Sequence, residues 1–445
     1  MTRRGGSAAA LIVFLHALTG AGAPTAAAQT SLSLDQAMQR AQGETAEARA
    51  LATSIDEAAA RVQRARAGFL PRVDVSETVQ RGNHPVFAFS SLLSQRRFSA
   101  EHFAIPSLNH PDAVTNTRTT IGVEQTIFDA GLTPLAVKAA QLGRDSAAAA
   151  RDTGRQDLAF RAARAFVRVL QLEAGLRAAD GAVAAAESDQ QRARARRDVG
   201  VVTDADVLAV DVHLADMRQR RIAAEGDLGV ARLELAEAIG APLTESLALV
   251  PPSGRPAAAD TESLVEAALA SHPLRRTADL QVQLADNARR GARAALLPTV
   301  GVQGGWEFNG SSLGDQRSSW VVGAELRLNV FRGFADSARM TETNHAHARA
   351  TAEHERVRRR IEVDIRAALT QLAAARARDD AGRASLAQAR ESQRIIRDRY
   401  EGGLATVTDV LRAAEAALDA ESRATAASMD VILQSVALDR ALGRL

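Results

Sequence analysis

The sequence Gly-Val-Val-Thr-Asp-Ala-Asp-Val-Leu occupies residues 200–208, and its pattern returns as Gly-Leu-Ala-Thr-Val-Thr-Asp-Val-Leu at residues 403–411. In each copy a glycine ends a long helical pattern, and glycine is favoured just past a helix C-terminus because it tolerates a left-handed φ. The threonine three residues later suits the N-cap of a second helix, and the aspartate three positions further on completes a capping box. Each copy therefore predicts the tight tip of a helical hairpin.

The same spacing relates the rest of the two halves of the 445-residue chain. Phe128 and Phe331 are separated by the same offset as the two tip glycines, and so are Gly240 and Gly443. Before Phe128 the first half carries a longer segment, which breaks the alignment. An internal repeat of this size constrains the fold more than chain length does. The expected divisions are a signal peptide at residues 1–28, a first repeat at 29–240, a linker at 241–259 and a second repeat at 260–445.

The N-terminus has the composition of a secretory signal peptide. Arg3 and Arg4 precede an apolar run at residues 8–18, and three alanines at residues 26–28 form an A-x-A cleavage pattern. The apolar run is too short to span a bilayer, which argues against the alternative of a retained anchor helix. We expect the mature chain to begin near Gln29.

The charge pattern argues against nucleic acid as a partner. The formal net charge of +2 equals the two arginines of the signal peptide, so the mature chain is neutral. Lys138 is the only lysine, and the sequence pI of about 9.7 reflects arginine usage. Arginine alternates with acidic residues, as on the solvated faces of coiled coils, and does not cluster. The lack of cysteine excludes disulfides, thiolate metal sites and lipid attachment through an N-terminal cysteine.

Helix and strand signals follow the same order in both halves. A capping box at Ser33 and Gln36 opens the first helix, and Phe-Leu-Pro at residues 69–71 stops it, because proline disfavours a helical residue before it. Leu-Leu-Pro at residues 296–298 has the same role in the second half. The first repeat is expected to contain a short helix at about 33–68, strands at about 70–80 and 117–128, a long helix at 133–199 and a helix at 204–240. The second is expected to contain a helix at 260–297, strands at about 298–308 and 320–331, a long helix at 334–401 and a helix at 407–443.

The expected helices are long and have narrow apolar seams. The first long helix holds about 65 residues, which is roughly 100 Å at the rise of an α-helix. In the helix at 204–240, Val207, Leu214, Leu228 and Leu235 lie in one heptad register, which predicts a coiled coil. The short helices of each half together match its long helix, so we expect them to stack end to end beside it. The expected fold class is therefore mainly α, a long antiparallel coiled-coil helical barrel, with a membrane β-barrel portion of four strands per chain.

The four strands alternate apolar and polar residues, as the strands of a membrane barrel do. Val73 and Val75 alternate with Asp74 and Ser76, for example. Four strands cannot close a barrel, and an open edge cannot lie in lipid because its backbone groups would lack partners. We therefore expect the chain to oligomerise, and three copies would form a twelve-stranded barrel. The residues expected to face its lumen are Glu124, Glu325 and Arg327.

Aromatic residues make up 3% of the chain, so their positions are informative. Trp306, Phe308 and Trp320 flank the third and fourth strands, where a barrel carries an interfacial girdle, although ordinary core packing is the alternative for them. Residues 81–116, between the first two strands, are rich in phenylalanine and are expected to be irregular. We expect this segment to pack over or into the barrel mouth, since an exposed apolar loop would be a liability. Its histidines, for which binding of a soft cation is the less favoured alternative, are His84, His102 and His110.

This combination resembles the TolC family of outer-membrane efflux proteins over nearly the whole mature chain. The resemblance rests on the proline junctions at residues 69–71 and 296–298, the strand ends at Phe128 and Phe331, and above all the doubled tip motif. It implies that three chains form a duct, in which a twelve-stranded barrel in outer-membrane lipid joins a twelve-helix periplasmic tunnel. It also implies that the tips meet a periplasmic adaptor and open when an inner-membrane pump engages. The residues placed at this docking and gating end are Gly200, Thr203, Asp204, Asp206, Gly403, Thr406 and Asp409.

The acidic residues of the tips have two alternative roles. Tunnels of this family often narrow at acidic rings, and Asp204, Asp206 and Asp409 are candidates for such a ring. Helix capping is the alternative for Asp206 and Asp409, and the capping-box spacing favours it.

The function implied by the resemblance is that of a passive exit duct in a Gram-negative outer membrane, working with a periplasmic adaptor and an RND-type inner-membrane pump. The exit duct of a type I protein secretion system with an ABC transporter is the alternative within the family. A periplasmic coiled-coil scaffold without a pore is the alternative from another class. No enzyme activity, metal or cofactor is expected, because the one G-x-S-x-G match, at residues 310–314, joins two strands. The sequence does not identify the exported substrate.

Overall fold

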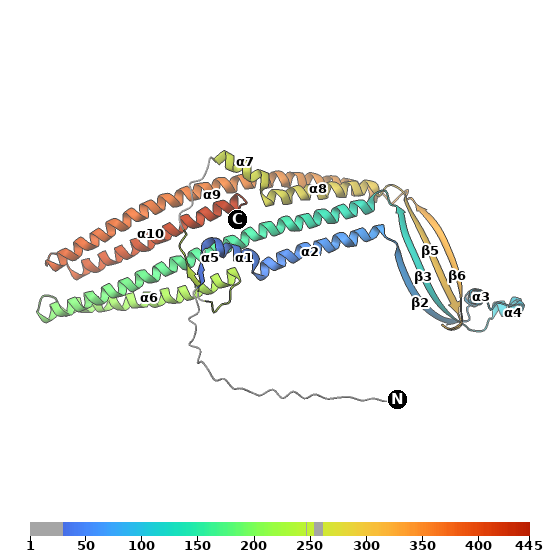
Figure 1. Cartoon of the computed structure of the whole chain (residues 1–445), viewed down its shortest axis with the longest axis horizontal. Coiled ribbons are helices and arrows are strands. Elements are labelled where there is room, and N and C mark those ends of the chain that lie inside the picture. The colour runs from blue at the N-terminus through green and yellow to red at the C-terminus, as the bar shows by residue number, and fades with distance from the viewer. Residues whose placement is uncertain (1–29, 246, 253–260) are drawn as a thin grey trace, which may run out of the picture.

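The computed structural model describes residues 30–245, 247–252 and 261–445 as an elongated helical body with a β-sheet at one end (Figure 1). The predicted signal peptide lies outside these described residues. The elements of the first half are β1 (Thr30–Leu32), α1 (Leu34–Gly43), α2 (Ala46–Arg66), η1 (Ala67–Phe69), β2 (Arg72–Gly82), α3 (Pro85–Ser94), η2 (Ala100–Phe103), α4 (Ile105–Asn109), β3 (Val114–Phe128), α5 (Leu132–Asp198) and α6 (Asp204–Ile239). They are followed by β4 (Leu247–Leu249), α7 (Thr261–Ser271), α8 (Pro273–Ala294), β5 (Thr299–Gly310), β6 (Gln316–Arg327), α9 (Ala335–Glu401) and α10 (Val407–Ala441).

Two long helices, α5 and α9, run the length of the body and have 67 residues each, which is roughly 100 Å. α5 packs against α2 near the sheet and against α6 toward the far end, and α9 packs against α8 and α10 in the same way (Figure 1). α5 also contacts α8 and α10, so it joins the two halves. The expected end-to-end stacking of short helices beside a long one is therefore confirmed.

Small and branched residues form the core of the body. The largest cluster includes Phe166 on α5 and Leu235 and Ile239 on α6, which are at most 1% exposed. The heptad positions predicted for α6, Val207 and Leu214 among them, are buried. Apolar packing against α5 therefore holds α6 in place, as the seven-residue spacing predicted.

Two of the shorter helices predicted as continuous, at 33–68 and 260–297, are each broken in two. The first is divided between α1 and α2, because the Thr45 side chain accepts the N–H of Ala48 and caps a new helix. The helix predicted at 260–297 is divided between α7 and α8. Pro273 has no N–H to continue the first helix, and His272 caps the second by accepting the N–H of Leu274 at 3.2 Å.

The predicted linker contains a strand that sequence analysis missed. β4 pairs in parallel with β1, with Ser31 opposite Ala248 and Leu32 opposite Leu249. Leu32 is 1% exposed and belongs to the main core cluster. This pairing fixes the first described residues of the chain to the middle of the body.

The main sheet is antiparallel, with the strand order β2-β3-β5-β6. β6 ends at Arg327, earlier than the predicted end at residue 331, because its partner β5 begins at Thr299, directly after Pro298. β3 contains an irregularity at Ile127, which shifts the register so that Phe128 lies opposite Val300. The regular alternation predicted for this strand is therefore interrupted at Ile127, because a bulge places an extra residue in one of the two paired strands.

The segment between β2 and β3 is more ordered than predicted. It was expected to be irregular over residues 81–116, but it holds α3, η2 and α4 and is flanked by a longer β3. Among the helices of the described ranges, none combines the length and the low polarity needed to cross a membrane.

Candidate functional site

One face of the main sheet is apolar across all four strands. Val75, Ile121, Trp306 and Trp320 lie opposite one another in a single row. Both tryptophans are more than half exposed in the single chain, at 52% and 71%. On the side of this row nearer the helices, apolar side chains continue along the same face. On the side farther from the helices, the next row of this face begins with Glu77, which is charged. The tryptophans therefore mark one border of an apolar band.

Aromatic residues also mark the helix-side border of this band. Phe128, Phe331 and Phe334 are all about half exposed or more, and the rings of Phe331 and Phe334 are 5.4 Å apart. Phe308 lies one row beyond the tryptophans, opposite Thr119. An apolar band with aromatic side chains at both borders is the pattern of a membrane-facing sheet surface.

The opposite face of the sheet is polar, and the three residues predicted to face a lumen lie on it. Glu124 is opposite Gln303, and Glu325 is opposite Gly301. Arg327 pairs with Glu325 at 3.0 Å. Glu124, Glu325 and Arg327 line one hollow of about 490 Å³ at the helix end of the sheet. The sheet thus separates an apolar side from a polar, mixed-charge side.

The sheet has two open edges. In the part of the chain that the structure describes, β2 pairs only with β3, and β6 pairs only with β5. The outer backbone groups of β2 and β6 are available to pair with another strand.

The two predicted tips lie at the end of the body far from the sheet (Figure 1). Gly200 and Gly403 both have a φ of 74°, in the left-handed region. The N–H of Gly200 donates to the Arg197 carbonyl at 2.9 Å, and the N–H of Val201 donates to the Arg196 carbonyl at 2.9 Å. The second tip has the equivalent pair of bonds, so both helices end in a Schellman motif.

Each tip also contains the predicted capping box. Asp206 N–H donates to Thr203 Oγ1 at 3.3 Å, and Thr203 N–H donates to the Asp206 carboxylate at 3.0 Å. Thr406 and Asp409 repeat this arrangement. Hydrogen bonds from the Thr406 hydroxyl and then from its N–H lower the pKa of Asp409. The carboxylates of Asp206 and Asp409 are therefore used by the caps.

Asp204 has a different environment from the other two acids. Its side chain is 85% exposed, and its carboxylate lies 3.8 Å from Arg197. The residue at the same position of the second tip is Val407, which is 6% exposed and packs with Val207 and Val210. The structure thus leaves one exposed acid at the first tip and an apolar anchor at the second.

A contact between the two hairpins, missed by sequence analysis, lies next to the tips. Arg196 on α5 donates to the Tyr400 carbonyl at 3.1 Å and to the Glu401 carbonyl at 3.3 Å. Its guanidinium also lies over the Tyr400 ring, 4.6 Å from the centroid. Tyr400 is the only tyrosine of the chain, which is the one sequence signal that pointed to this position.

Comparison with known proteins identifies the family. Residues 25–241 and 264–444 match the family described as outer membrane efflux protein. The chain belongs to this family. An efflux protein of this family lies in the outer membrane, and the family works as a channel of efflux or secretion systems together with an adaptor and an inner-membrane transporter.

Two curated relatives of this outer membrane efflux protein cover most of its length. The outer membrane efflux protein BepC of Brucella suis biovar 1 is 27% identical over 333 residues, which are 73% of this chain and 72% of BepC. Protein CyaE of Bordetella pertussis is 26% identical over 342 residues, which are 75% of this chain and 72% of CyaE.

Solved structures of outer-membrane channels share the fold. VceC of Vibrio cholerae superimposes with a TM-score of 0.75 at 17% identity, covering 92% of this chain and 96% of VceC. The CmeC outer membrane channel of Campylobacter jejuni gives a TM-score of 0.79 at 15% identity, covering 92% of this chain and 85% of CmeC. The family and these neighbours are channel proteins rather than enzymes.

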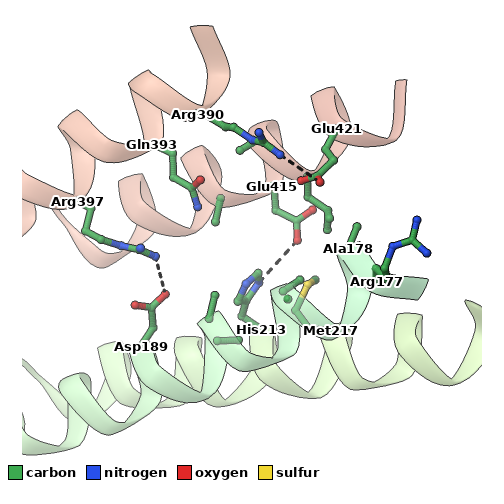
Figure 2. A pocket seen from close by; sticks show the side chains of 17 residues that line it. Arg177, Ala178, Asp189, His213, Met217, Arg390, Gln393, Arg397, Glu415 and Glu421 are labelled. Carbon is green, nitrogen blue, oxygen red and sulfur yellow. Dashed lines mark ion pairs between the residues drawn. The ribbon is translucent and has the colours of Figure 1, made fainter. Parts of the chain in front are cut away.

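A polar seam joins α5 and α6 to α9 and α10 in the efflux protein (Figure 2). Arg397 lies 3.7 Å from Asp189, and His213 lies 3.7 Å from Glu415. These residues line a hollow of about 370 Å³ between α5 and α6 on one side and α9 and α10 on the other. Ion pairs therefore connect the hairpins here, beside a small apolar cluster in which Leu418 packs against Met217 and its neighbours.

The alternative sites considered from sequence find no support in the geometry. The G-x-S-x-G match lies in the turn between β5 and β6, so the strand-to-helix elbow of a nucleophile is lacking there. Among the described residues, no group of three or more His, Cys, Asp or Glu side chains is arranged to hold a metal ion. His102 Nδ1 accepts the N–H of Ser99 at 3.1 Å, which uses one of its two ring nitrogens.

Proposed function

We propose that this efflux protein is the passive outer-membrane exit duct of a tripartite efflux system and that three chains form one duct. The observation that supports it best is a four-stranded sheet with one apolar and one polar face, mounted on a helical body about 100 Å long. The apolar face suits lipid, the polar face suits a water-filled lumen, and the body is long enough to extend far into the periplasm.

The open edges of the sheet support the trimer. An exposed edge in lipid leaves backbone groups without partners, so β2 of one copy must pair with β6 of the next. Four strands fall short of the minimum for a closed barrel, and three copies give twelve. Twelve is an even number, as bacterial single-chain barrels have.

The two side edges of the helical body also suit packing between neighbouring copies in a closed trimer. α2 and α6 lie at one margin of the body and α9 lies at the other (Figure 1). An apolar stripe on α6 is about half exposed or more in the single chain, and it comprises Leu208, Val212, Ile222, Val230 and Leu233. Exposed Val363 and Ile395 lie on α9. In a trimer, α6 of each copy packs against α9 of its neighbour and this surface is buried.

The tips are the proposed docking and gating end. They lie at the far end of the body from the sheet, and their backbone is exposed while their caps hold it in a fixed shape. Gly200 and Gly403 set the turn, and Asp204 adds an exposed acid to the first tip. Contact of this end with a periplasmic adaptor, and opening by separation of the hairpins at Arg196 and Tyr400, are the roles we assign.

Efflux is favoured over secretion by the names of the matched family and of BepC, both described as outer membrane efflux protein. We therefore assign an RND-type pump as the inner-membrane partner and keep type I secretion with an ABC transporter as the alternative. Crosslinking in cells followed by identification of the captured transporter separates the two. A periplasmic scaffold without a pore is disfavoured by the two-faced sheet.

Conductance of the purified full chain tests the duct. The chain should migrate as a trimer in detergent and produce unitary current steps in a planar bilayer. A matched variant, Ala324→Arg, places a charge on the apolar face and should prevent stable insertion, because an arginine in the lipid-facing band costs about 2–4 kcal/mol. A monomer without conductance would refute the proposed function and favour the scaffold.

A further inference from the structure

The most buried polar side chains of the main sheet lie at the end far from the helices. Asn309 is 0% exposed, and Asn116 is 1% exposed. Asn116 Nδ2 donates to Asn309 Oδ1 at 3.0 Å, and Arg118 Nε donates to the same oxygen at 3.1 Å. Asn309 lies opposite Arg118, so these side chains belong to the polar face. That face is therefore covered at this end, even in a single chain.

The segment that supplies this cover comprises residues 85–109, here called the exit segment. It contains α3, η2 and α4 and lies at the end of the sheet (Figure 1). Gln95, which follows α3, is 3% exposed. Its Nε2 donates to Asn116 Oδ1 at 2.9 Å and to the Gly310 carbonyl at 3.3 Å. One buried amide thus ties the exit segment to both β3 and β5.

Two further contacts show the direction in which the exit segment runs. A Cβ at Gly82 would meet the Phe87 ring at 3.7 Å, and Gly82 shares the polar face of β2 with Asp74. Arg96 Nη2 donates to the Ser318 carbonyl on β6 at 3.1 Å. The exit segment therefore leaves the first strand and contacts the other three strands at this end of the sheet.

The exit segment has a small aromatic core of its own. The Phe98 ring lies 4.6 Å from that of Phe89 and 5.1 Å from that of Phe103, both in edge-to-face geometry. Such pairs stabilise a fold beyond the burial of their area. The exit segment is therefore a folded unit rather than a loose loop.

Several large apolar side chains are exposed on this unit. Val86 is 70% exposed, Phe103 is 64% exposed and Ile105 is 73% exposed. Large apolar side chains gathered on a surface commonly mark a contact. We propose that the exit segments of three copies meet through these side chains inside the mouth of the duct and narrow it.

The partner of this surface is the same surface in the two other copies. The exit segment lies on the polar face, which points toward the common axis when the sheets close around a lumen. This inference rests on the proposed function, because the segments approach one another only in a closed assembly. Narrowing at the sheet end is separate from opening at the tips, so the duct has a constriction at each end.

The second half of the chain provides a built-in control. β5 and β6 are joined at the same end of the sheet by the short turn between Gly310 and Gln316, without an inserted helix. Leu313 in that turn is 70% exposed, as exposed as Val86. Leu313 has no aromatic unit beneath it, so we expect no contact between copies at this residue.

Conductance and crosslinking test the constriction in the full-length trimer. Replacing residues 85–109 with a short Gly-Ser turn should raise the unitary conductance several-fold, and Gln95→Ala should increase current fluctuations by releasing the anchor. Because the chain has no cysteine, Phe103→Cys and Ile105→Cys can be crosslinked cleanly with a short bismaleimide, and both should form covalent dimers and trimers. Leu313→Cys should remain monomeric on a denaturing gel.

The outcomes separate the inference from the proposed function. Trimers that conduct, with unchanged conductance after replacement and no crosslinks at residue 103 or 105, would overturn the constriction alone. A wild-type chain that neither trimerises nor conducts would overturn the duct itself. Crosslinking at residue 313 as strong as at residue 103 would also contradict the assigned contact.

Discussion

The two tips share one backbone geometry but differ in several side chains, among them the residue that follows the N-cap. Both have a left-handed glycine with a φ of 74°, and both begin the next helix with a Thr–Asp capping box. At the first position of that helix, the first tip has Asp204, which is exposed, and the second has Val407, which is buried. Similar turns therefore present different surfaces.

This difference shows what the internal repeat preserves. Caps and left-handed glycines determine the path of the chain, and they recur. The residue that follows the N-cap decides the contact: Val407 packs the second hairpin against Val207 of the first, while Asp204 faces solvent. Of the three acids considered for a constriction, Asp204 alone has a carboxylate outside a cap, so it is the one best placed to meet a partner.

Replacing both left-handed glycines with proline removes the turn geometry that the two tips share. This change should have the largest effect, which is measured as crosslinking to the adaptor. Proline fixes φ near −65° and lacks an N–H, whereas Gly200 and Gly403 have a φ of 74° and donate their N–H groups to the preceding turn. Each substitution should cost about 3 kcal/mol locally. Gly200→Pro with Gly403→Pro should abolish crosslinking to the adaptor while trimers, held by the distant sheet, persist.

Gly402→Ala is the matched control for the proline variant. Gly402 has a φ of −79°, and a Cβ there would meet its nearest atoms at 3.6 Å, an ordinary contact. Crosslinking should be unchanged in this variant. Unchanged crosslinking in the double-proline variant would contradict the assignment of the tips to docking.

Exchanging the residue that follows the N-cap tests this contrast directly. Val407→Asp makes the second tip like the first and places a carboxylate among Val207, Val210 and Ala193, so it should cost about 3 kcal/mol. The reverse change, Asp204→Val, affects an exposed side chain and should shift the free energy of unfolding by less than about 0.5 kcal/mol. Denaturant titration of the purified trimers measures both. Equal effects would show that the tips are equivalent.

Loosening the contact between the hairpins should lower the free energy of unfolding less than Val407→Asp does. It should also change the unitary current measurably. Arg196→Ala removes two hydrogen bonds from a charged donor and a cation–π contact, which together should cost about 2 kcal/mol. The unitary conductance should rise if this contact keeps the tips together. Tyr400→Phe is the control, since it keeps the ring, and the buried Tyr400 hydroxyl has no hydrogen-bond partner among the described residues. Unchanged conductance in Arg196→Ala would exclude this contact from the gate.

The features predicted from sequence are those whose causes lie within a few residues of one another. A glycine past a helix end, a Thr–Asp pair three residues apart and an alternating strand each carry their own signal, and the tips of both hairpins agree with it. The two faces of the sheet follow in the same way from the period of a strand. The break at Pro273 was also readable, since proline is a local signal, but the predicted helix at 260–297 ran through it.

The missed features depend on residues far apart in the chain. The pairing of β1 with β4 and the contact of Arg196 with Tyr400 exist only once the halves are packed together. The bulge at Ile127 appears only in the pairing with β5. The capping-box spacing already distinguished Asp206 and Asp409 from Asp204, whereas the burial of Val407 at the position equivalent to Asp204 depends on the packing of the hairpins.

The smallest effect expected concerns the pH dependence of the second cap. Thr406 donates its hydroxyl to the Asp409 carboxylate at 2.7 Å and its N–H at 3.0 Å, and these bonds hold the pKa of Asp409 below its ordinary value of 3.8. A lowered pKa in the folded tip means that Asp409 stabilises it above pH 3.8, and that this contribution is lost as the pH falls through the folded pKa. Thr406→Ala removes the hydroxyl, so the pKa should rise toward 3.8 and the loss should begin at a higher pH. Amide hydrogen exchange at Asp409 between about pH 5 and pH 2 reports the cap, with the neighbouring Thr408→Ala as control. An identical pH midpoint in Thr406→Ala and Thr408→Ala would show that the Thr406 hydroxyl does not set the pKa.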